Sequence, residues 1–257
     1  MKIVNKHLNY PKAELITPNS KGYIQIAAQI DSTPFPFFIR MSKKKREIIK
    51  YIDNLLTSIA KLNGIETISS FKTMVIPPAK HAYFEKVKSN IHVANFDYAI
   101  LIEAESVEIA KSIRHNSLMK NIEEYLKEQA NDMHISTFKN ARRIHEVDKT
   151  TKGVFLFNYF YAADVKKLLP VWEYTAGWFT KETGLNNSTL LIPLEGEPSD
   201  FGVINHCKWD KLFDFLPSLL FKKSLRRYVV DNFDANQIAS MPMLYKVIKN
   251  YNTEQNI

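Results

Sequence analysis

The chain repeats one order of predicted elements twice, and this internal duplication restricts the folds open to it more than any other feature. In each half, a strand, a helix, two strands, a second helix and a last strand follow one another. Lys21-Gly22 opens the first strand of one half, and Lys152-Gly153 opens that of the other. Both halves end their first helix near a glycine, Gly64 or Gly184, which enters the left-handed terminal conformation at little cost. The shared order predicts two copies of one unit.

Three further pairs of segments keep the same order along the chain. The matches are Met74-Val75-Ile76-Pro77 with Leu190-Leu191-Ile192-Pro193, Asp97-Tyr98-Ala99-Ile100-Leu101 with Asp200-Phe201-Gly202-Val203-Ile204, and Ala130-Asn131 with Ala235-Asn236. The first copy is longer, with extra residues at 32–41 and around 81–94. We therefore predict a first unit over residues 1–148 and a second unit over residues 149–257, which carries the expected site.

The last helix and the last strand of each copy are predicted from single capping or helix-breaking residues and from short apolar stretches. The second helix of the second copy is expected to begin after Asp210 and to break at Pro217-Ser218, close to where its counterpart breaks at His115-Asn116-Ser117. The last strands are predicted over residues 133–138 and 243–248, where apolar residues gather. The residues before Lys21 show no pattern and predict a leader without regular structure.

A βαββαβ unit is the ferredoxin-like split βαβ motif, whose antiparallel sheet carries helices on one face only. The bare face needs a cover, and two such units placed sheet to sheet cover each other. The predicted fold class is therefore α+β, with tandem ferredoxin-like units forming a dimeric α/β barrel within one chain. Sheet edges left open would allow a further homodimer.

One stretch of the second copy resembles a known group of proteins. The run Trp209…Phe213…Phe215…Ser218…Phe221-Lys222 resembles the third-strand and second-helix segment of monooxygenase-like domains. Together with the duplicated pattern, it resembles the dimeric α/β-barrel superfamily, which includes antibiotic-biosynthesis-monooxygenase-like proteins, chlorite dismutases and dye-decolourising peroxidases. The resemblance implies a small-molecule enzyme or binder of the monooxygenase-like type, with its pocket between the sheet and the helices of the second copy. A non-catalytic ligand-binding or assembly module of the same fold is the alternative, and the resemblance leaves open whether the chain is an enzyme.

Composition narrows the partners and the compartment. The net charge of +8 is spread over short basic groups, and the aromatic pairs of RNA-recognition strands are absent, so nucleic acid is not an expected partner. The single cysteine, Cys207, excludes an intramolecular disulfide and fits a reducing compartment. The chain start lacks an apolar signal core, and the longest apolar run is shorter than the about 20 residues of a membrane span. We expect a cytoplasmic protein without a membrane span.

The second copy places polar residues where the first has mostly apolar ones. Position by position, Asn158 falls opposite Ala27, Asn205 opposite Ile102, and His206 opposite Glu103. An amide inside an apolar strand costs roughly 1–3 kcal/mol unless it finds a partner. We therefore expect the site in the second copy, with His206 and Asn205 as candidate catalytic residues. Because they are neighbours on a strand, they point to opposite faces, and at most one of them lies between the sheets.

Four further residues are candidates for ligand binding: Asn158, Tyr174, Trp178 and Trp209. Each has a structural alternative, because buried amides usually satisfy one another and aromatic residues at helical spacing usually form core. No metal-ligand spacing is present, and Cys207 has no partner that would make a nucleophile pair.

The cofactor is left open, and neither haem nor flavin is excluded. In haem-degrading members of the resembled superfamily, a His on the second helix, a few residues beyond a Phe-Lys pair, binds the iron, and a Trp on that helix shapes the pocket. Matching Phe221-Lys222 to that pair puts Leu225 at the His position and Phe215 at the Trp position, and the first copy offers Glu123. None of these can replace the family's residues, so we predict that the chain does not degrade haem in this way, although His206 could bind iron from its strand.

Overall fold

The computed structural model describes residues 1–31, 41–77 and 81–252, and these form two successive runs of strands and helices. The first run contains β1 (Gly22–Gln29), α1 (Lys43–Ile59), β2 (Ile65–Val75), α2 (Ala82–Val87), β3 (Tyr98–Ala104), α3 (Val107–Arg114), α4 (Ser117–Gln129) and β4 (Asp132–Arg143). The second contains β5 (Val154–Ala162), the 3₁₀ turn η1 (Val165–Lys167), α5 (Leu168–Thr183), β6 (Thr189–Pro193), β7 (Val203–Trp209), α6 (Leu212–Phe221), the π-helical η2 (Leu225–Val230), α7 (Asp231–Ala235) and β8 (Ile238–Asn252). The insertion expected at residues 32–41 lies almost wholly outside the described residues, and that at 81–94 contains α2.

The eight strands close into one antiparallel barrel in the order β1-β3-β2-β8-β5-β7-β6-β4. Each run supplies four adjacent strands in the ferredoxin-like order, and the two units meet at two seams, β2 with β8 and β4 with β6. Both seams join a second strand to a fourth strand, as the two-fold axis of a dimer would require. The predicted fold, two ferredoxin-like units in one barrel, is confirmed. Because these seams pair the edges of both sheets, the described strands leave no open edge of the kind that suggested a homodimer.

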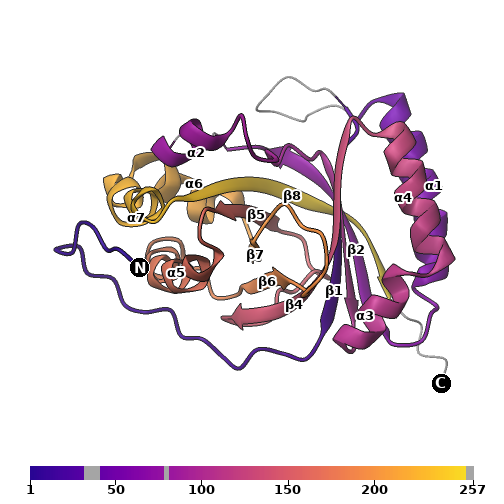
Figure 1. Cartoon of the computed structure of the whole chain (residues 1–257), viewed down its shortest axis with the longest axis horizontal. Coiled ribbons are helices and arrows are strands. Elements are labelled where there is room, and N and C mark those ends of the chain that lie inside the picture. The colour runs from indigo at the N-terminus through magenta and orange to yellow at the C-terminus, as the bar shows by residue number, and fades with distance from the viewer. Residues whose placement is uncertain (32–40, 78–80, 253–257) are drawn as a thin grey trace.

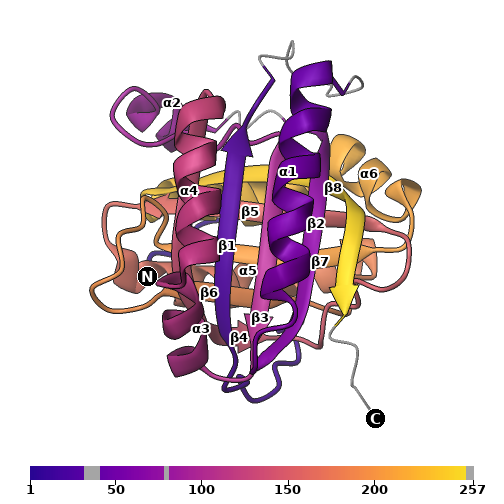
Figure 2. The same ribbon diagram turned by 90° about the vertical axis from the view of Figure 1, so that its right-hand side faces the viewer.

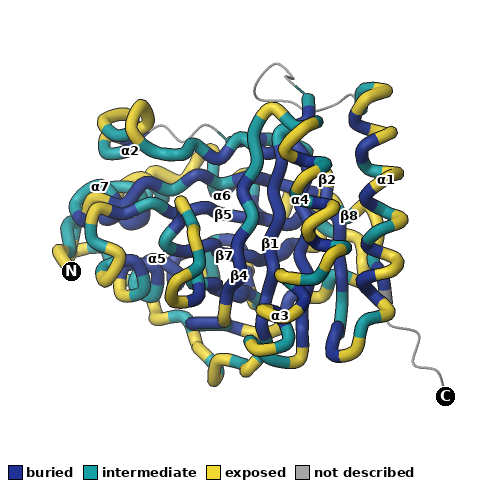
Figure 3. The backbone as a smooth tube through the Cα atoms, turned by 45° about the vertical axis from the view of Figure 1, so that its right-hand side comes forward, coloured by how far each residue is buried: buried dark blue, intermediate teal, exposed yellow. Residues whose placement is uncertain are grey.

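The helices lie outside the barrel in two groups (Figures 1 and 2). Helices α1, α3 and α4 pack on the sheet of the first unit through a core rich in isoleucine. Helices α5, α6 and α7, with η2, cover the sheet of the second unit. Figure 3 shows the strands buried along most of their length, while the outward sides of the helices are exposed. Each unit therefore has its own core between sheet and helices, in addition to the core inside the barrel.

Aromatic side chains from both units fill the barrel interior. Phe71 of β2 meets Phe155 and Phe157 of β5 edge-on, with ring centroids 5.4 and 5.2 Å apart. Tyr159 packs against Phe201 with ring centroids 4.9 Å apart. Edge-to-face pairs of this kind stabilise the folded chain beyond the area that they bury. The space between the two sheets is thus a packed core.

Gly184 is the C-cap of α5, as the sequence predicts, but α1 ends at Ile59 with Ala60 as its C-cap, and Gly64 lies in the turn before β2. Gly64 follows α1 with φ +81°, and Gly184 follows α5 with φ +65°. A Cβ built on Gly64 would also lie 2.6 Å from Ile109 Cδ1. Both the left-handed backbone and the close approach of Ile109 therefore favour glycine at Gly64.

The leader, which has no pattern in the sequence, packs across the helices of the second unit. The backbone N–H of Lys2 donates to Asn236 Oδ1 at 2.7 Å, and that of Val4 donates to Asn232 Oδ1 at 2.9 Å. A Cβ on Gly177 of α5 would lie 1.8 Å from the carbonyl oxygen of Pro11. Glycine at this position lets the leader lie directly on α5. The division at residue 148 separates the strands of the two runs, but the leader crosses it.

Several predicted boundaries are wrong. Strands β4 and β8 are longer than expected, because each continues into a seam with the other unit. Lys211, and not Asp210, is the N-terminal capping residue of α6, where Asp214 accepts a hydrogen bond from its backbone. The helix also continues through Pro217 and ends at Phe221, where Lys222 is extended, and the π-helical η2 begins at Leu225. Pro217 is exposed, so the carbonyl that it leaves without a helical partner can be hydrated.

Among the described residues, no helix has both the length and the apolar character required to cross a bilayer.

Candidate functional site

Asn158 of β5 and Asn205 of β7 are direct cross-strand partners, and both side chains face the helices that cover the second unit. In the first unit, Ile24 of β1 pairs with Ile102 of β3. Both isoleucines are fully buried in the core beneath the helices. The second unit therefore carries a pair of carboxamides where the first carries a pair of isoleucines.

The strand register corrects one sequence match. Glu103 and His206 occupy equivalent positions on β3 and β7, as predicted. Counting across the ladders from them places Asn158 opposite Ile24 and not opposite Ala27. The sequence match aligns Gly22 with Gly153. It is displaced because more residues separate Gly153 from Asn158 than separate Gly22 from Ile24.

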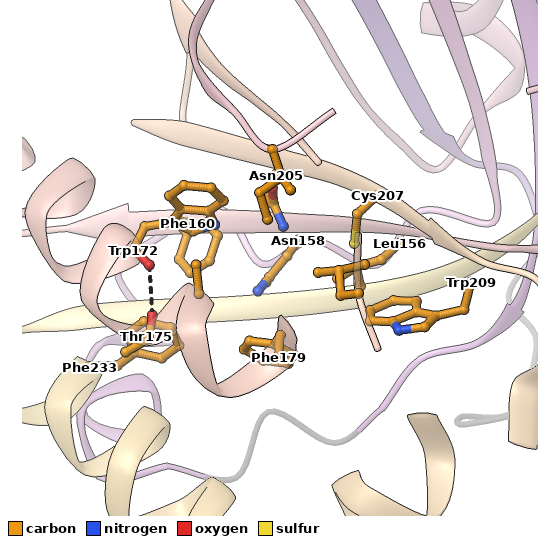
Figure 4. Close-up of a pocket in the computed structure, with 13 residues that line it drawn as sticks. Leu156, Asn158, Phe160, Trp172, Thr175, Phe179, Asn205, Cys207, Trp209 and Phe233 are labelled. Atoms are coloured by element: carbon orange, nitrogen blue, oxygen red, sulfur yellow. Dashed lines mark hydrogen bonds between the residues drawn. The ribbon is translucent and has the colours of Figure 1, made fainter. Parts of the chain in front are cut away.

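The two carboxamides point into a cavity of about 30 Å³ between the sheet and α5 (Figure 4). A cavity of this volume holds one or two water molecules. Its lining is apolar and aromatic apart from the asparagines, Thr175 and Cys207. The lining residues are Ile144, Leu156, Asn158, Phe160, Trp172, Thr175, Ala176, Phe179, Leu185, Asn205, Cys207, Trp209 and Phe233.

Small residues on α5 explain why the cavity lies in the second unit. Helix α1 packs against its sheet with long side chains, among them Ile52 and Leu56. Helix α5 instead buries Thr175 and Ala176 at the cavity. The hydroxyl of Thr175 is directed to its own helix, where it donates to the carbonyl of Val171 at 2.9 Å. The shorter side chains leave the space that Asn158 and Asn205 face.

The two carboxamides differ in their hydrogen bonds. Asn205 Oδ1 accepts a hydrogen bond from the hydroxyl of the fully buried Ser188 at 2.5 Å. Asn158 Oδ1 is buried and has no hydrogen-bond partner among the described residues. An unpaired buried acceptor costs about 1–3 kcal/mol, so Asn158 lowers the stability of the fold unless a molecule in the cavity donates to it.

The wall formed by Trp209 is held in place by contacts outside the cavity. Its ring stacks on Phe215 of α6 with centroids 4.3 Å apart, and its Nε1 donates to Thr183 Oγ1 at 3.1 Å. Cys207, next to it on the cavity side, is a free thiol. Burial raises the pKa of this thiol well above its usual value, so the group stays protonated. The cavity therefore offers flat apolar surfaces and neutral polar groups.

His206 points to the other side of the sheet, into the barrel. Its ring stacks on Phe157 with centroids 4.2 Å apart, and its Nδ1 lies 3.2 Å from the carbonyl oxygen of Leu156. Nε2 is buried without a partner among the described residues. Burial lowers the pKa of His206 well below its ordinary value, and the nearby charge of Lys149 lowers it further. The structure thus separates the two candidate catalytic residues, as their alternation on the strand predicts, and leaves His206 as a neutral imidazole.

Tyr174 and Trp178 lie outside the residues that line the cavity. Trp178 is fully buried, and its Nε1 donates to Ser224 Oγ at 3.0 Å. Tyr174 stacks on Tyr228 with centroids 4.7 Å apart. Both residues hold α5 to the chain around η2, and a ligand-binding role for either stays a prediction.

The aromatic residues of α5 that do line the cavity are Trp172 and Phe179. They share one helix face with Thr175 and Ala176, at steps of three and four residues from Leu168. This spacing is visible in the sequence. It does not show, however, which face of a helix so rich in apolar residues meets the sheet.

The cavity does not fit haem or flavin in the described conformation. Its volume of about 30 Å³ is far smaller than either group, and its lining contains no histidine. Phe215, at the predicted Trp position, is fully buried against Trp209, and Leu225 lies in η2. No group of three or more metal-binding side chains is found among the described residues.

Comparison of the structure with known proteins identifies its fold. No known family profile and no curated protein sequence matches the chain. An anthrone oxidase-like protein is similar over 97% of this chain and 98% of its own, with a TM-score of 0.67 and 13% identity. A candidate monooxygenase from Fusobacterium nucleatum matches with a TM-score of 0.52 and 9% identity, covering 91% of this chain and 95% of its own. A mutant chlorite dismutase from Candidatus Nitrospira defluvii matches with a TM-score of 0.50 and 10% identity, covering 91% and 94%.

These similarities extend over nearly the whole length of each chain. Because the sequence identities are low, they show a shared fold and nothing further. The chain has the dimeric α/β-barrel fold of monooxygenase-like proteins, with both ferredoxin-like units in a single polypeptide.

Proposed function

We propose that the cavity between β5, β7 and α5 binds a small aromatic molecule that carries hydroxyl or carbonyl groups, and that the protein is a monooxygenase-like enzyme or binder for it. The observation that carries the proposal is the buried, unpartnered Oδ1 of Asn158 in an aromatic cavity. A ligand hydroxyl would donate to this oxygen, and the rings of Trp172 and Phe179 offer surfaces for an aromatic ring.

Binding requires the helices to move apart, because the cavity admits only one or two water molecules as described. The cover consists of one long helix, α5, and three short pieces, α6, η2 and α7, whereas the first unit has two long helices, α1 and α4, with the short α3. A π-helical segment such as η2 often occurs at functional sites. This broken cover supports a ligand site in the second unit.

The anthrone oxidase-like neighbour suggests the reaction class to test. An anthrone has a methylene group between two aromatic rings, and O₂ can convert this methylene into a carbonyl. One oxygen atom enters the product, the other leaves as water, and the four electrons lost by the carbon reduce the dioxygen. The carboxamide N–H groups of Asn158 and Asn205 would stabilise the enolate oxygen that forms when the methylene loses its proton to water. Cys207 is the one titratable residue in the described lining, and its protonated thiol is a poor base.

The alternative is a non-catalytic ligand-binding or assembly module. The filled barrel interior and the small cavity favour it, because neither offers ready space for a substrate. The two functions differ in whether bound ligand is converted.

The test is a titration with 1,8-dihydroxyanthrone, in which quenching of tryptophan emission reports binding at Trp172 and Trp209. The absorbance of the quinone reports oxidation against a protein-free control. Replacing Asn158 by Leu removes one ligand hydrogen bond, so we expect affinity to fall about tenfold. Asn121→Leu is the control, since this exposed asparagine lies on α4 of the first unit, and it should bind as the parent does.

Saturable quenching that depends on Asn158 would support the proposal, and quinone formation above the protein-free rate would make the protein an enzyme. Binding without conversion would make it a binder. Quenching that is absent, or equal in the parent and in Asn158→Leu, would overturn the proposal.

A further inference from the structure

Helix α6 exposes large apolar side chains to solvent. Phe213 and Phe221 are 77% and 79% exposed, and Leu220 is 64% exposed. Isolated surface hydrophobic residues need no explanation, but three on one short helix indicate a contact surface.

The exposed residues, together with the half-buried Leu216, form one face of α6. At 100° per residue, Phe213, Leu216, Pro217, Leu220 and Phe221 project from the same side of the helix. The opposite side is attached to the protein: Phe215 is fully buried, and the hydroxyl of Ser218 donates to the carbonyl of Glu182 at 2.6 Å. The orientation of α6 is therefore determined by its packing, and it turns the apolar face outward.

A groove of about 670 Å³ lined by lysines adjoins the start of this helix. Lys211 and Leu212, where α6 begins, are part of the lining, together with Lys72, Lys152 and Lys246 from neighbouring segments. The groove lies along the β2–β8 seam, and Figure 2 shows α6 beside these strands. The basic groove thus adjoins the N-terminal end of the apolar face, and we call the two together the α6 surface.

Four of the five lysines that line the groove form no ion pair within the described residues. Lys72 and Lys246 are direct cross-strand partners, an arrangement in which like charges repel. No ion pair is found within the described residues for either of them, or for Lys152 and Lys211. A fifth lysine, Lys149, is different because it pairs with the buried Glu103 at 2.6 Å. The four free ammonium groups can therefore receive an external anion.

Basic residues also follow the other end of α6. Lys223 and Arg226 are exposed and have no ion-pair partner among the described residues. Carboxylates also lie near the α6 surface: Asp210 in the groove, Asp148 bonded to Thr150 and Thr151 of its lining, Asp214 at the helix start, and Glu182, which pairs with Lys222. Asp214 is bonded to the backbone N–H of Lys211, so the surface remains strongly basic.

We propose that the α6 surface docks on an anionic lipid bilayer. Helix α6 lies in the plane of the membrane with Phe213, Leu220 and Phe221 among the upper acyl chains, and the lysines of the groove contact phosphate headgroups. An apolar face flanked by lysine and arginine is typical of helices that bind membrane surfaces. Each basic side chain close to an anionic surface adds to the attraction, which weakens as the salt concentration rises.

Charge decides between a bilayer and a second copy of the chain. A symmetric dimer through this face would bring the lysines of one groove close to those of the other. Since like charges facing each other disfavour association, the surface suits an anionic partner better than itself. The overall charge of +8 acts in the same direction.

The experiment is co-sedimentation of the full chain with two kinds of vesicle. One is phosphatidylcholine alone, and the other is phosphatidylcholine with about 30% phosphatidylglycerol, which is anionic. We expect binding to the anionic vesicles that weakens as salt rises. The double variants Phe213→Ser/Phe221→Ser and Lys72→Gln/Lys246→Gln should each lower the partition coefficient about tenfold or more. A Phe213→Trp variant should show a blue shift of its emission with anionic vesicles, because the new indole enters the acyl region.

Matched controls replace the same kinds of residue elsewhere. Val165→Ser changes an apolar side chain that is 57% exposed outside the α6 surface, and Lys111→Gln/Lys120→Gln removes two exposed lysines from the first unit. Both controls should bind vesicles as the parent does. Equal binding to neutral and anionic vesicles, or none at low salt, would overturn the proposal. A concentration-dependent dimer that Phe213→Ser/Phe221→Ser abolishes, without vesicle binding, would show instead that α6 joins two copies.

Discussion

Asn158 and Asn205 stand opposite each other across β5 and β7, but only Asn205 has its side-chain oxygen paired, with Ser188 at 2.5 Å. This asymmetry makes Asn158 the group in the cavity that is available to a ligand. It also predicts that the two residues respond differently to the same substitution.

Asn205→Leu should destabilise the fold by about 1–3 kcal/mol, because it leaves the buried hydroxyl of Ser188 without its acceptor. Asn158→Leu should leave stability unchanged or raise it by about 1 kcal/mol, because it removes an unpaired buried oxygen. Urea unfolding of both variants measures the difference. A larger loss of stability in Asn158→Leu than in Asn205→Leu would show that Asn158 is paired in the folded protein.

Filling the cavity should block the ligand without disturbing the fold. Ala176→Val adds two methyl groups at the cavity wall, with a cost of no more than about 1–3 kcal/mol from overpacking. We expect quenching of tryptophan emission by 1,8-dihydroxyanthrone to be lost while the circular dichroism spectrum is retained. Ala110→Val, at a buried position in the first unit, is the control for overpacking and should keep the quenching. Full quenching in Ala176→Val would place the ligand elsewhere.

The stability of the protein should fall as the pH drops below about 6.5, partly because of His206. Burial lowers its pKa in the folded chain, so the unfolded chain binds more protons between the two pKa values, and protons favour unfolding there. In His206→Phe, the slope of unfolding free energy against pH should decrease by up to about 1.4 kcal/mol per pH unit below pH 6. His134, whose burial lowers its pKa to about 4, supplies the slope that remains. Identical slopes in parent and variant would mean that His206 is not buried as a neutral imidazole.

His92 should show the opposite behaviour. Its Nε2 lies 2.8 Å from Asp132 and its Nδ1 lies 2.7 Å from Asp200, so the ring joins carboxylates of both units. The hydrogen bond to Asp132, followed by that to Asp200, raises the pKa of His92 to about 9. The stabilisation is fully present below the unfolded pKa of about 6.5, and is lost as the pH rises through about 9. Imidazole NMR resonances should show His92 still protonated at pH 8, and Asp200→Asn should lower its pKa. If His92 of the parent protein titrates near pH 6.5, its hydrogen bonds to Asp132 and Asp200 are not formed in solution.

The fold could be predicted because the duplication left local signals at corresponding points. Gly64 and Gly184 lie just after the first helix of each unit, and the matched segments at residues 97–101 and 200–204 lie at the start of β3 and β7. The lengths of β4 and β8 could not be predicted, because they depend on pairing with the other unit. The path of the leader could not be predicted either, because it depends on a close contact between Gly177 and Pro11, which are far apart in the sequence.

The candidate site was predictable in part. Asn158, Asn205 and Trp209 were selected from the sequence, and all three line the cavity. On α5 the sequence analysis selected Tyr174 and Trp178, which face other segments, whereas Trp172 and Phe179 line the cavity. The sequence does not show which side of α5 faces the cavity, because α5 is apolar on nearly every side. The orientation of the helix about its axis depends on its contacts with the leader and with η2.

The side-chain NH₂ resonances of Asn158 and Asn205 test the central claim most directly. In ¹H–¹⁵N correlation spectra of the protein titrated with 1,8-dihydroxyanthrone, we expect these two pairs and the indole N–H of Trp172 and Trp209 to shift together and to saturate. The indole N–H of Trp178, outside the cavity, should move far less. Saturating shifts confined to other residues, or no shifts at all, would contradict a ligand site between β5, β7 and α5.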